Sequence, residues 1–245
     1  MARALVAVPA IALVTLAAFA GPVEQRAPAA PAGEPPVATV YGAPAPAEDD
    51  GQADPDEPEH AIPGPRIAWR RSRAMGLPFA GRLVRGVQFP AEGPWWFTWD
   101  PILQRSPDRP WRRYGTDALV RTLLKVVREF RTAHPDAPRI GVGDLSRPRG
   151  GAFGRAYGGL GHASHQNGLD ADVYYPRKDG LEKEAFTPAQ VDRRLAQDLV
   201  DRFVEAGAER VFVGPSLRLR GPRRVVRFLV HHDDHLHLRI PQPPE

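Results

Sequence analysis

Apolar residues recur at helical spacing in two segments of the chain. The first segment begins at Thr116, which can cap a helix, and ends before Pro135, with apolar positions at Leu119, Val120, Leu123, Leu124, Val127 and Phe130. The second segment starts at Thr187, where Gln190 completes a capping box, and continues to Gly207. The pattern therefore predicts two amphipathic helices.

Short runs with strand character lie between and after the two predicted helices. We expect strands over residues 139–145, 169–175, 210–213, 225–230 and 235–240. The fold class predicted from this order is α+β, with a small and largely antiparallel sheet and flanking helices. The aromatic stretch 95–99 is interpreted as core packing, with a groove wall as the alternative.

The first 64 residues differ from the rest in composition. Residues 1–20 combine Arg3, an apolar run and a small-x-small end, which predicts a signal peptide; an uncleaved signal anchor is the alternative. Residues 21–64 contain ten prolines and nine acidic residues without apolar periodicity. They are interpreted as a disordered linker, with a propeptide as the alternative. The folded domain is expected over residues 65–245.

Charge and cysteine content narrow the class of protein. Nine acidic residues and two arginines precede residue 65, so a total charge of +4 leaves +11 on residues 65–245. Such a basic domain suits an anionic polymer such as cell wall, and charge alone would suit nucleic acid equally. The chain has no cysteine, so no disulfide stabilises it and no cysteine can carry a lipid anchor.

Six of the eight histidines fall into two short clusters, one at His162 and His165 and the other at His231, His232, His235 and His237. If residues 235–240 form a strand, period-two alternation puts both its histidines on one face with Arg239, and its leucines on the other. The leucine face would pack on the core. The imidazole face would then point into a polar site.

The first cluster leads directly into another predicted strand. Asp170, Asp172 and Tyr174 share one face of that strand, and Gly168 supplies a bend between His165 and the strand. Imidazole nitrogens and a carboxylate oxygen are typical zinc ligands, and a catalytic site keeps the fourth position for water. We therefore expect His165, Asp172 and one histidine of the second cluster to bind zinc on the sheet face. A hydrogen-bonding role for each histidine is the alternative.

At these residues the chain resembles the penicillin-insensitive murein endopeptidases, zinc peptidases grouped with lysostaphin-type and D-Ala-D-Ala metallopeptidases. The resemblance rests on residues 143–151 (GDLSRPRGG), the string from His162 to Asp172, residues 86–115, and the His-x-His at 235–237. It covers roughly residues 66–240. The absence of cysteines and the long acidic linker depart from familiar members.

The resemblance implies roles for individual residues. His165, Asp172 and His237 would bind one zinc ion, His232 falls where the wider group places its catalytic base, and His235 would lie beside the metal and share the acid and base work. His162 would line the substrate site or a second metal. Apart from the resemblance, Arg149, or else Arg147, is expected to hold a substrate carboxylate or carbonyl through its planar guanidinium.

The expected activity is hydrolysis of peptide cross-links of peptidoglycan, including D-alanyl bonds, by metal-activated water. The expected partner is peptidoglycan rather than nucleic acid, and the expected location is periplasmic or extracellular, without a stable membrane span after signal cleavage. A D,D-carboxypeptidase or dipeptidase on the same scaffold is one alternative. A noncatalytic, zinc-stabilised cell-wall-binding module is another.

Overall fold

The computed structural model of the protein describes residues 65–154 and 163–243. The predicted signal peptide (1–20), the predicted linker (21–64) and His162 lie outside the described residues. The two α-helices of the described part are α1 (Asp117–Ala133) and α2 (Arg193–Glu205). Neither helix is long and apolar enough to cross a membrane.

A six-stranded mixed sheet forms the centre of the domain, in the order β4-β6-β7-β10-β8-β9. Its strands are β4 (Trp96–Thr98), β6 (Ile140–Val142), β7 (Asp170–Tyr174), β8 (Arg210–Val213), β9 (Val226–Phe228) and β10 (His235–Arg239). The three inner pairings are antiparallel, and the outer pairs β4–β6 and β8–β9 are parallel. The predicted α+β class is confirmed.

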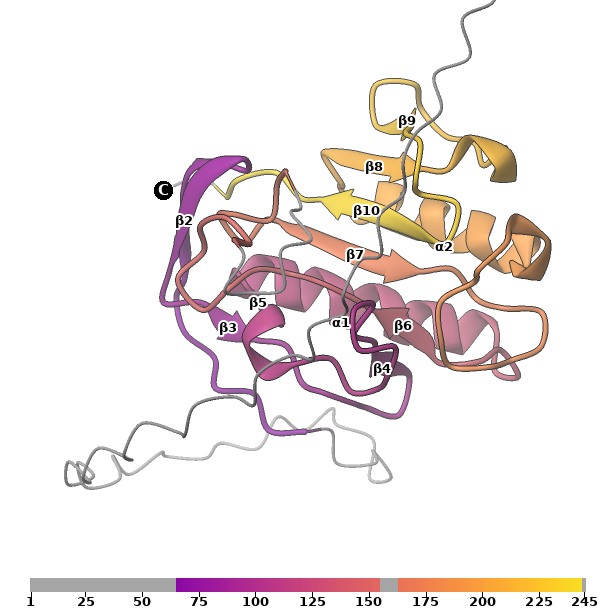
Figure 1. The fold of residues 1–245 in the computed structure, drawn as a ribbon, viewed down its shortest axis with the longest axis horizontal. Coiled ribbons are helices and arrows are strands. Elements are labelled where there is room, and N and C mark those ends of the chain that lie inside the picture. The colour runs from indigo at the N-terminus through magenta and orange to yellow at the C-terminus, as the bar shows by residue number, and fades with distance from the viewer. Residues whose placement is uncertain (1–64, 155–162, 244–245) are drawn as a thin grey trace, which may run out of the picture. The chain divides into compact units, whose positions relative to one another are not determined.

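Two small sheets stand beside the central one. The hairpin of β1 (Arg73–Leu77) and β2 (Ala80–Val84) forms the first, and β3 (Val87–Gln88) with β5 (Tyr114–Gly115) forms the second. The hairpin lies at the left edge of the domain in Figure 1. None of these strands was expected from the sequence pattern.

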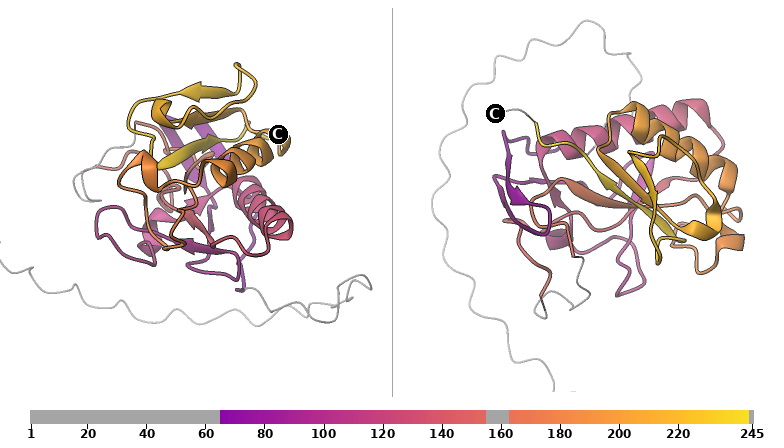
Figure 2. Two further views of the ribbon diagram at one scale, coloured as in Figure 1. Left: turned by 90° about the vertical axis from the view of Figure 1, so that its right-hand side faces the viewer. Right: turned by 90° about the horizontal axis from the view of Figure 1, so that it is seen from above.

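Both helices cover the same face of the central sheet, where Figure 2 shows α1 and α2 side by side. Thr116 caps α1 as predicted, because its side chain accepts a hydrogen bond from the backbone N–H of Leu119 at 3.1 Å. Apolar side chains of both helices pack on the inward residues of β7 and β10 and form the core with them. The opposite face of β7 and β10 is thereby left for polar side chains.

The second helix begins later than its sequence pattern predicts. Thr187 and Gln190 form the expected capping box, but they open only a 3-10 turn over Pro188–Gln190. Val191 is extended and buried, and Asp192 then caps α2 by accepting hydrogen bonds from two backbone N–H groups. Burial of the Val191 side chain breaks the helix, so the prediction of one continuous helix from Thr187 was wrong.

Candidate metal centre

The pairing of β7 with β10 brings two of the candidate residues face to face. In the antiparallel register His237 lies opposite Asp172. The alternating residues Leu236 and Leu238 are fully buried in the core, so the strand alternation expected from the sequence is present. Both polar side chains therefore project from the sheet face that the helices leave uncovered.

His165 reaches the same point from a loop that precedes β7. Its backbone is left-handed, with a φ of +65°, a conformation that costs a residue other than glycine free energy on the order of 1–3 kcal/mol. Gly168 supplies the bend with a φ of +80°, and a Cβ there would lie 2.7 Å from the Leu83 side chain. The ring is fixed because its Nδ1 lies 2.5 Å from the carbonyl oxygen of Leu145.

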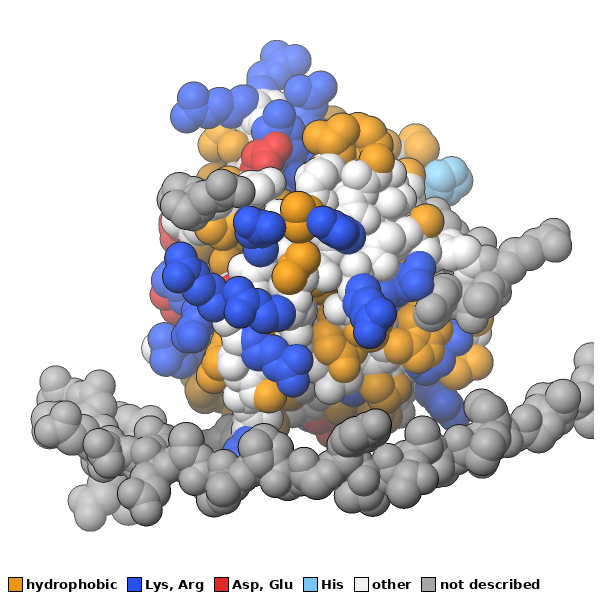
Figure 3. Space-filling view, turned by 90° about the vertical axis from the view of Figure 1, so that its left-hand side faces the viewer, with side chains coloured by type: hydrophobic (Ala, Val, Ile, Leu, Met, Phe, Trp, Pro, Cys, Tyr) orange, Lys and Arg blue, Asp and Glu red, His pale blue; other side chains and the backbone are white. Residues whose placement is uncertain are grey.

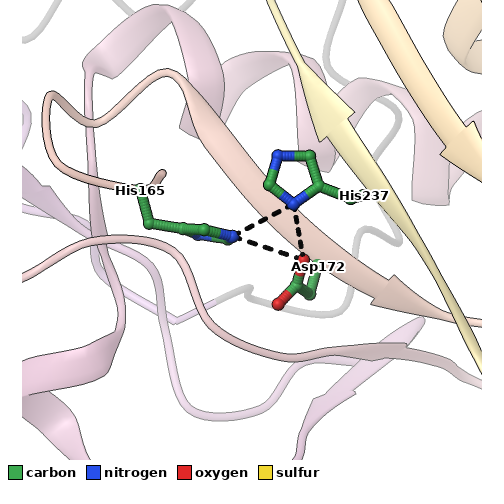
Figure 4. Close-up of side chains that lie close together, drawn as sticks. All are labelled: His165, Asp172 and His237. Atoms are coloured by element: carbon green, nitrogen blue, oxygen red, sulfur yellow. Dashed lines mark hydrogen bonds and ion pairs between the residues drawn. The ribbon is translucent and has the colours of Figure 1, made fainter. Parts of the chain in front are cut away.

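The three side chains converge on one point, as Figure 4 shows. His165 Nε2 lies 3.2 Å from His237 Nδ1 and 3.4 Å from Asp172 Oδ1, and the last two atoms are 3.1 Å apart. All three residues are buried. A tetrahedral ion with bonds of about 2.0–2.1 Å separates its ligand atoms by about 3.3 Å, so the spacing fits such an ion.

The protonation of the two rings strengthens this fit. The Leu145 carbonyl can only accept, so His165 Nδ1 carries its proton; His237 Nε2 likewise donates to Asp170 Oδ1 at 2.9 Å. In the neutral rings the other nitrogens then present lone pairs toward each other and toward the Asp172 oxygen. A bound cation would accept these lone pairs, and in its absence a second ring proton on His237 would lie between Nδ1 and Asp172, because the pKa of His237 is raised.

Asp170 and Arg239 form a further layer behind His237. Asp170 is fully buried and accepts hydrogen bonds from His237 Nε2 and from Arg239 Nε, the latter at 2.7 Å. Burial would raise the pKa of Asp170, but the hydrogen bond with His237 and the nearby positive charges lower it. Burial likewise opposes charge on His237, yet hydrogen bonds to Asp170 and Asp172 raise its pKa to about 9. The pocket therefore favours a positive charge at the ligand position.

His232 and His235 stand beside this cluster and differ in their surroundings. The two rings are 4.8 Å apart between centroids, and His232 is 6.1 Å from the His237 ring. Burial lowers the pKa of His232, whose Nδ1 lies 2.9 Å from the carbonyl oxygen of Val230. Burial also opposes charge on His235, but Asp172 and Asp234 outweigh it and raise its pKa. One ring therefore favours the neutral form and the other the charged form.

The arginines proposed for substrate binding lie in the turn after β6. The Arg149 side chain is exposed, and its carbonyl accepts a hydrogen bond from the backbone of Leu83 at 2.9 Å. Arg147 donates from Nη1 to the carbonyl of Ala152 at 2.6 Å. The turn contacts residues 163–169, the loop before β7 that carries the candidate ligand His165 and is called the metal loop below, since the N–H of Gly151 donates to the carbonyl of Gln166 at 2.8 Å.

The sequence pattern gave no role to a buried ion pair near the site. Arg112 is fully buried and binds both oxygens of Asp144 through Nε and Nη2. The backbone carbonyl of Asp144 accepts from the N–H of Asp172 at 2.9 Å, so this pair holds the segment next to a candidate ligand. An aspartate near the end of the expected strand 139–145 was the available signal. Its partner, which lies 32 residues away, gave none.

Comparison with known proteins gives a consistent family match. The family model described as penicillin-insensitive murein endopeptidase matches residues 74–219. That range contains His165 and Asp172 and ends before His237. Curated proteins of the same name are 31% identical, over 134 residues in Salmonella heidelberg (strain SL476) and over 164 residues in Escherichia coli O1:K1 / APEC.

These alignments cover part of each protein. They include 42% of this chain and 46% of the Salmonella protein, and 55% and 56% respectively for the Escherichia coli protein. The chain thus spans about half the length of the curated relatives that it matches.

Proposed function

Because the chain belongs to the penicillin-insensitive murein endopeptidase family, we propose that it is a zinc metallopeptidase that hydrolyses peptide cross-links of bacterial peptidoglycan. The D-alanyl bonds of the cross-links are the proposed target. Peptidoglycan lies outside the cytoplasmic membrane, so this function requires export, in agreement with the signal peptide predicted over residues 1–20.

One observation carries the proposal. His165 Nε2, Asp172 Oδ1 and His237 Nδ1 lie within 3.1–3.4 Å of one another, and the other nitrogen of each ring has its own acceptor in the Leu145 carbonyl or Asp170. Two imidazoles and one carboxylate favour zinc over calcium or magnesium, which prefer oxygen ligands throughout. Three protein ligands also suit a catalytic rather than a structural site, because a structural zinc site is closed by four.

The chemistry divides between the ion and the neighbouring histidines. A bound zinc ion would lower the pKa of water toward neutrality and polarise the scissile carbonyl. His232 keeps its Nδ1 proton on the Val230 carbonyl, so its Nε2 is the acceptor for the proton of the attacking water and returns it to the leaving amine. His235 has its Nδ1 at 2.8 Å from Asp234 Oδ1 and donates from Nε2 to the developing oxyanion.

Muropeptide analysis tests this function. Purified sacculi are incubated with the protein, with and without a chelator, and the released fragments are identified by mass spectrometry. We expect cross-linked dimers to become monomers, and the chelator to prevent it. Loss of terminal residues from monomers with intact dimers would identify a carboxypeptidase instead, and binding without new termini would refute catalysis.

A further inference from the structure

The β1–β2 hairpin and the residues that flank it are rich in positive charge. Residues 65–91 contain no acidic residue and six exposed arginines, namely Arg66, Arg70, Arg71, Arg73, Arg82 and Arg85. Figure 3 views the domain from the hairpin side and shows Lys and Arg side chains gathered over this face, with hydrophobic side chains between them. Charge of one sign on one face attracts an anionic partner.

A hollow of about 480 Å³ lies within this surface. Arg71, Arg73 and Arg85 line it together with Thr116 and Gln242. The hollow is close to the metal loop, because the backbone N–H of Thr116 donates to the carbonyl of Gly168 at 2.9 Å. It therefore offers guanidinium groups for carboxylates within the same part of the domain as the candidate metal centre.

The tip of the hairpin is apolar and exposed. Leu77 and Phe79 keep 54% and 58% of their surface accessible. Between them, the Pro78 carbonyl accepts from the N–H of Gln166 at 2.9 Å, and the Asn167 side chain donates to the hairpin backbone at 3.2 Å. The tip is thus hydrogen-bonded to the two residues that follow the candidate ligand His165.

From this arrangement we infer that the hairpin surface, defined as residues 66–85 with its hollow, is a docking surface for the murein polymer itself. Murein combines sugar rings and aliphatic peptide side chains, which suit Leu77 and Phe79, with peptide carboxylates, which suit the arginines. A purely charged polymer would not use an exposed leucine and phenylalanine. The inference rests on the proposed function, because it names where the substrate of that site is held.

The position of the tip favours murein over a lipid bilayer. The hydrogen bonds from the Gln166 backbone and the Asn167 side chain hold the tip and the metal loop in one region of the surface. A strand of polymer bound along the hairpin would therefore lead toward the candidate metal centre. A bilayer bound at the tip would bring no peptide to that centre.

Cosedimentation with purified sacculi tests the surface, with a chelator present so that nothing is cleaved. We expect the variant Leu77→Ser/Phe79→Ser to bind about tenfold more weakly than the unmodified protein, because burial of two half-exposed apolar side chains is lost. We expect a similar loss for Arg71→Gln/Arg85→Gln, and added salt should weaken the binding of the unmodified protein.

Matched controls change the same residue types elsewhere on the surface. Leu103→Ser/Leu181→Ser alters two residues that are 43% and 50% exposed, and Arg128→Gln/Arg194→Gln removes two charges from exposed positions of the helices. Both controls should bind sacculi as the unmodified protein does. Circular dichroism melting of each variant identifies any that fails to fold.

The outcomes separate this inference from the proposed function. Equal binding by the hairpin variants and the unmodified protein overturns the docking surface, as does equal weakening in the controls. Loss of binding to phosphatidylglycerol vesicles with unchanged binding to sacculi also overturns it, in favour of a membrane surface. If the unmodified protein binds sacculi through the hairpin but never converts dimers to monomers without chelator, the proposed catalysis fails and the surface stands.

Discussion

Asp170 fixes the tautomer of a candidate ligand, so replacing it should weaken metal binding without touching the metal. In Asp170→Asn the amide can present its N–H₂ group to His237 Nε2, which then accepts rather than donates. The ring proton moves to Nδ1, the atom that faces His165 and Asp172 at 3.1–3.2 Å. Loss of a carboxylate behind a ligating histidine lowers metal affinity about 10–100-fold. That change corresponds to about 1.4–2.7 kcal/mol.

Competition against a chromophoric zinc chelator measures this affinity directly. Asp198→Asn is the matched control, because Asp198 also contacts a histidine and an arginine, with Oδ2 3.1 Å from His134 Nε2 and 2.5 Å from Arg202 Nε. It lies on α2, on the covered side of the sheet. The control should bind zinc as the unmodified protein does. Unchanged zinc affinity in Asp170→Asn, in a variant that melts normally, would show that His237 does not bind the ion through Nδ1.

The remaining predictions concern the ligands, the loop and a buried carboxyl group. His165→Ala should lose both zinc and muropeptide cleavage, whereas His232→Ala should keep zinc and lose turnover. Elemental analysis measures the zinc content, and mass spectrometry measures the cleavage. Cleavage by metal-free His165→Ala would refute the candidate metal centre. Gly168→Ala should destabilise the domain by about 1–3 kcal/mol and weaken zinc binding, because the new Cβ meets Leu83 at a strained φ. Gly180→Ala has a similar φ of +70° and nothing within 4 Å, so in chemical denaturation it should lose less stability and keep its zinc affinity. Burial, Asp144 and Asp100 raise the pKa of Asp108 to about 8 against the opposing charge of Arg112. The folded state thus holds this proton more tightly than the unfolded chain does. The stabilisation that comes from this proton is fully present below about pH 3.9. It falls by up to about 1.4 kcal/mol per pH unit as pH rises, and it is lost once pH has passed about 8. Asp108→Asn should therefore flatten the fall in melting temperature between pH 5 and 8, and an unchanged slope would refute the assignment.

Local patterns in the sequence predicted the parts of the site that lie on regular strands. Alternation placed His237 and Asp172 on the uncovered faces of their strands, and the β7–β10 register then sets them opposite each other. That register could not be predicted, because either strand could slip by two residues and keep the same faces. The roles of the site residues remain predictions until the variants are measured.

Long-range contacts account for most of what the sequence did not reveal. The hairpin has weak strand signals, and it is held to the metal loop by backbone bonds that leave no trace in side-chain pattern, such as Gln166 N–H to the Pro78 carbonyl. Asp170, which accepts a hydrogen bond from His237, shares its strand face with Asp172. Alternation therefore identified the direction of this side chain but not its partner. Val191 broke a helix whose capping box was otherwise correct, because tertiary burial outweighed local preference.

The antiparallel pairing of β7 with β10 has a consequence for how the protein would respond to metal scarcity. Two of the three candidate ligands belong to neighbouring strands of the core sheet, and the ring of the third is held by its hydrogen bond to the Leu145 carbonyl, so we expect the ligand geometry to persist without an ion. Removal of the ion would leave a folded but inactive protein, which would bind zinc again without a refolding step when zinc is added. Cobalt bound to the same three residues would then report on the site through its visible absorption.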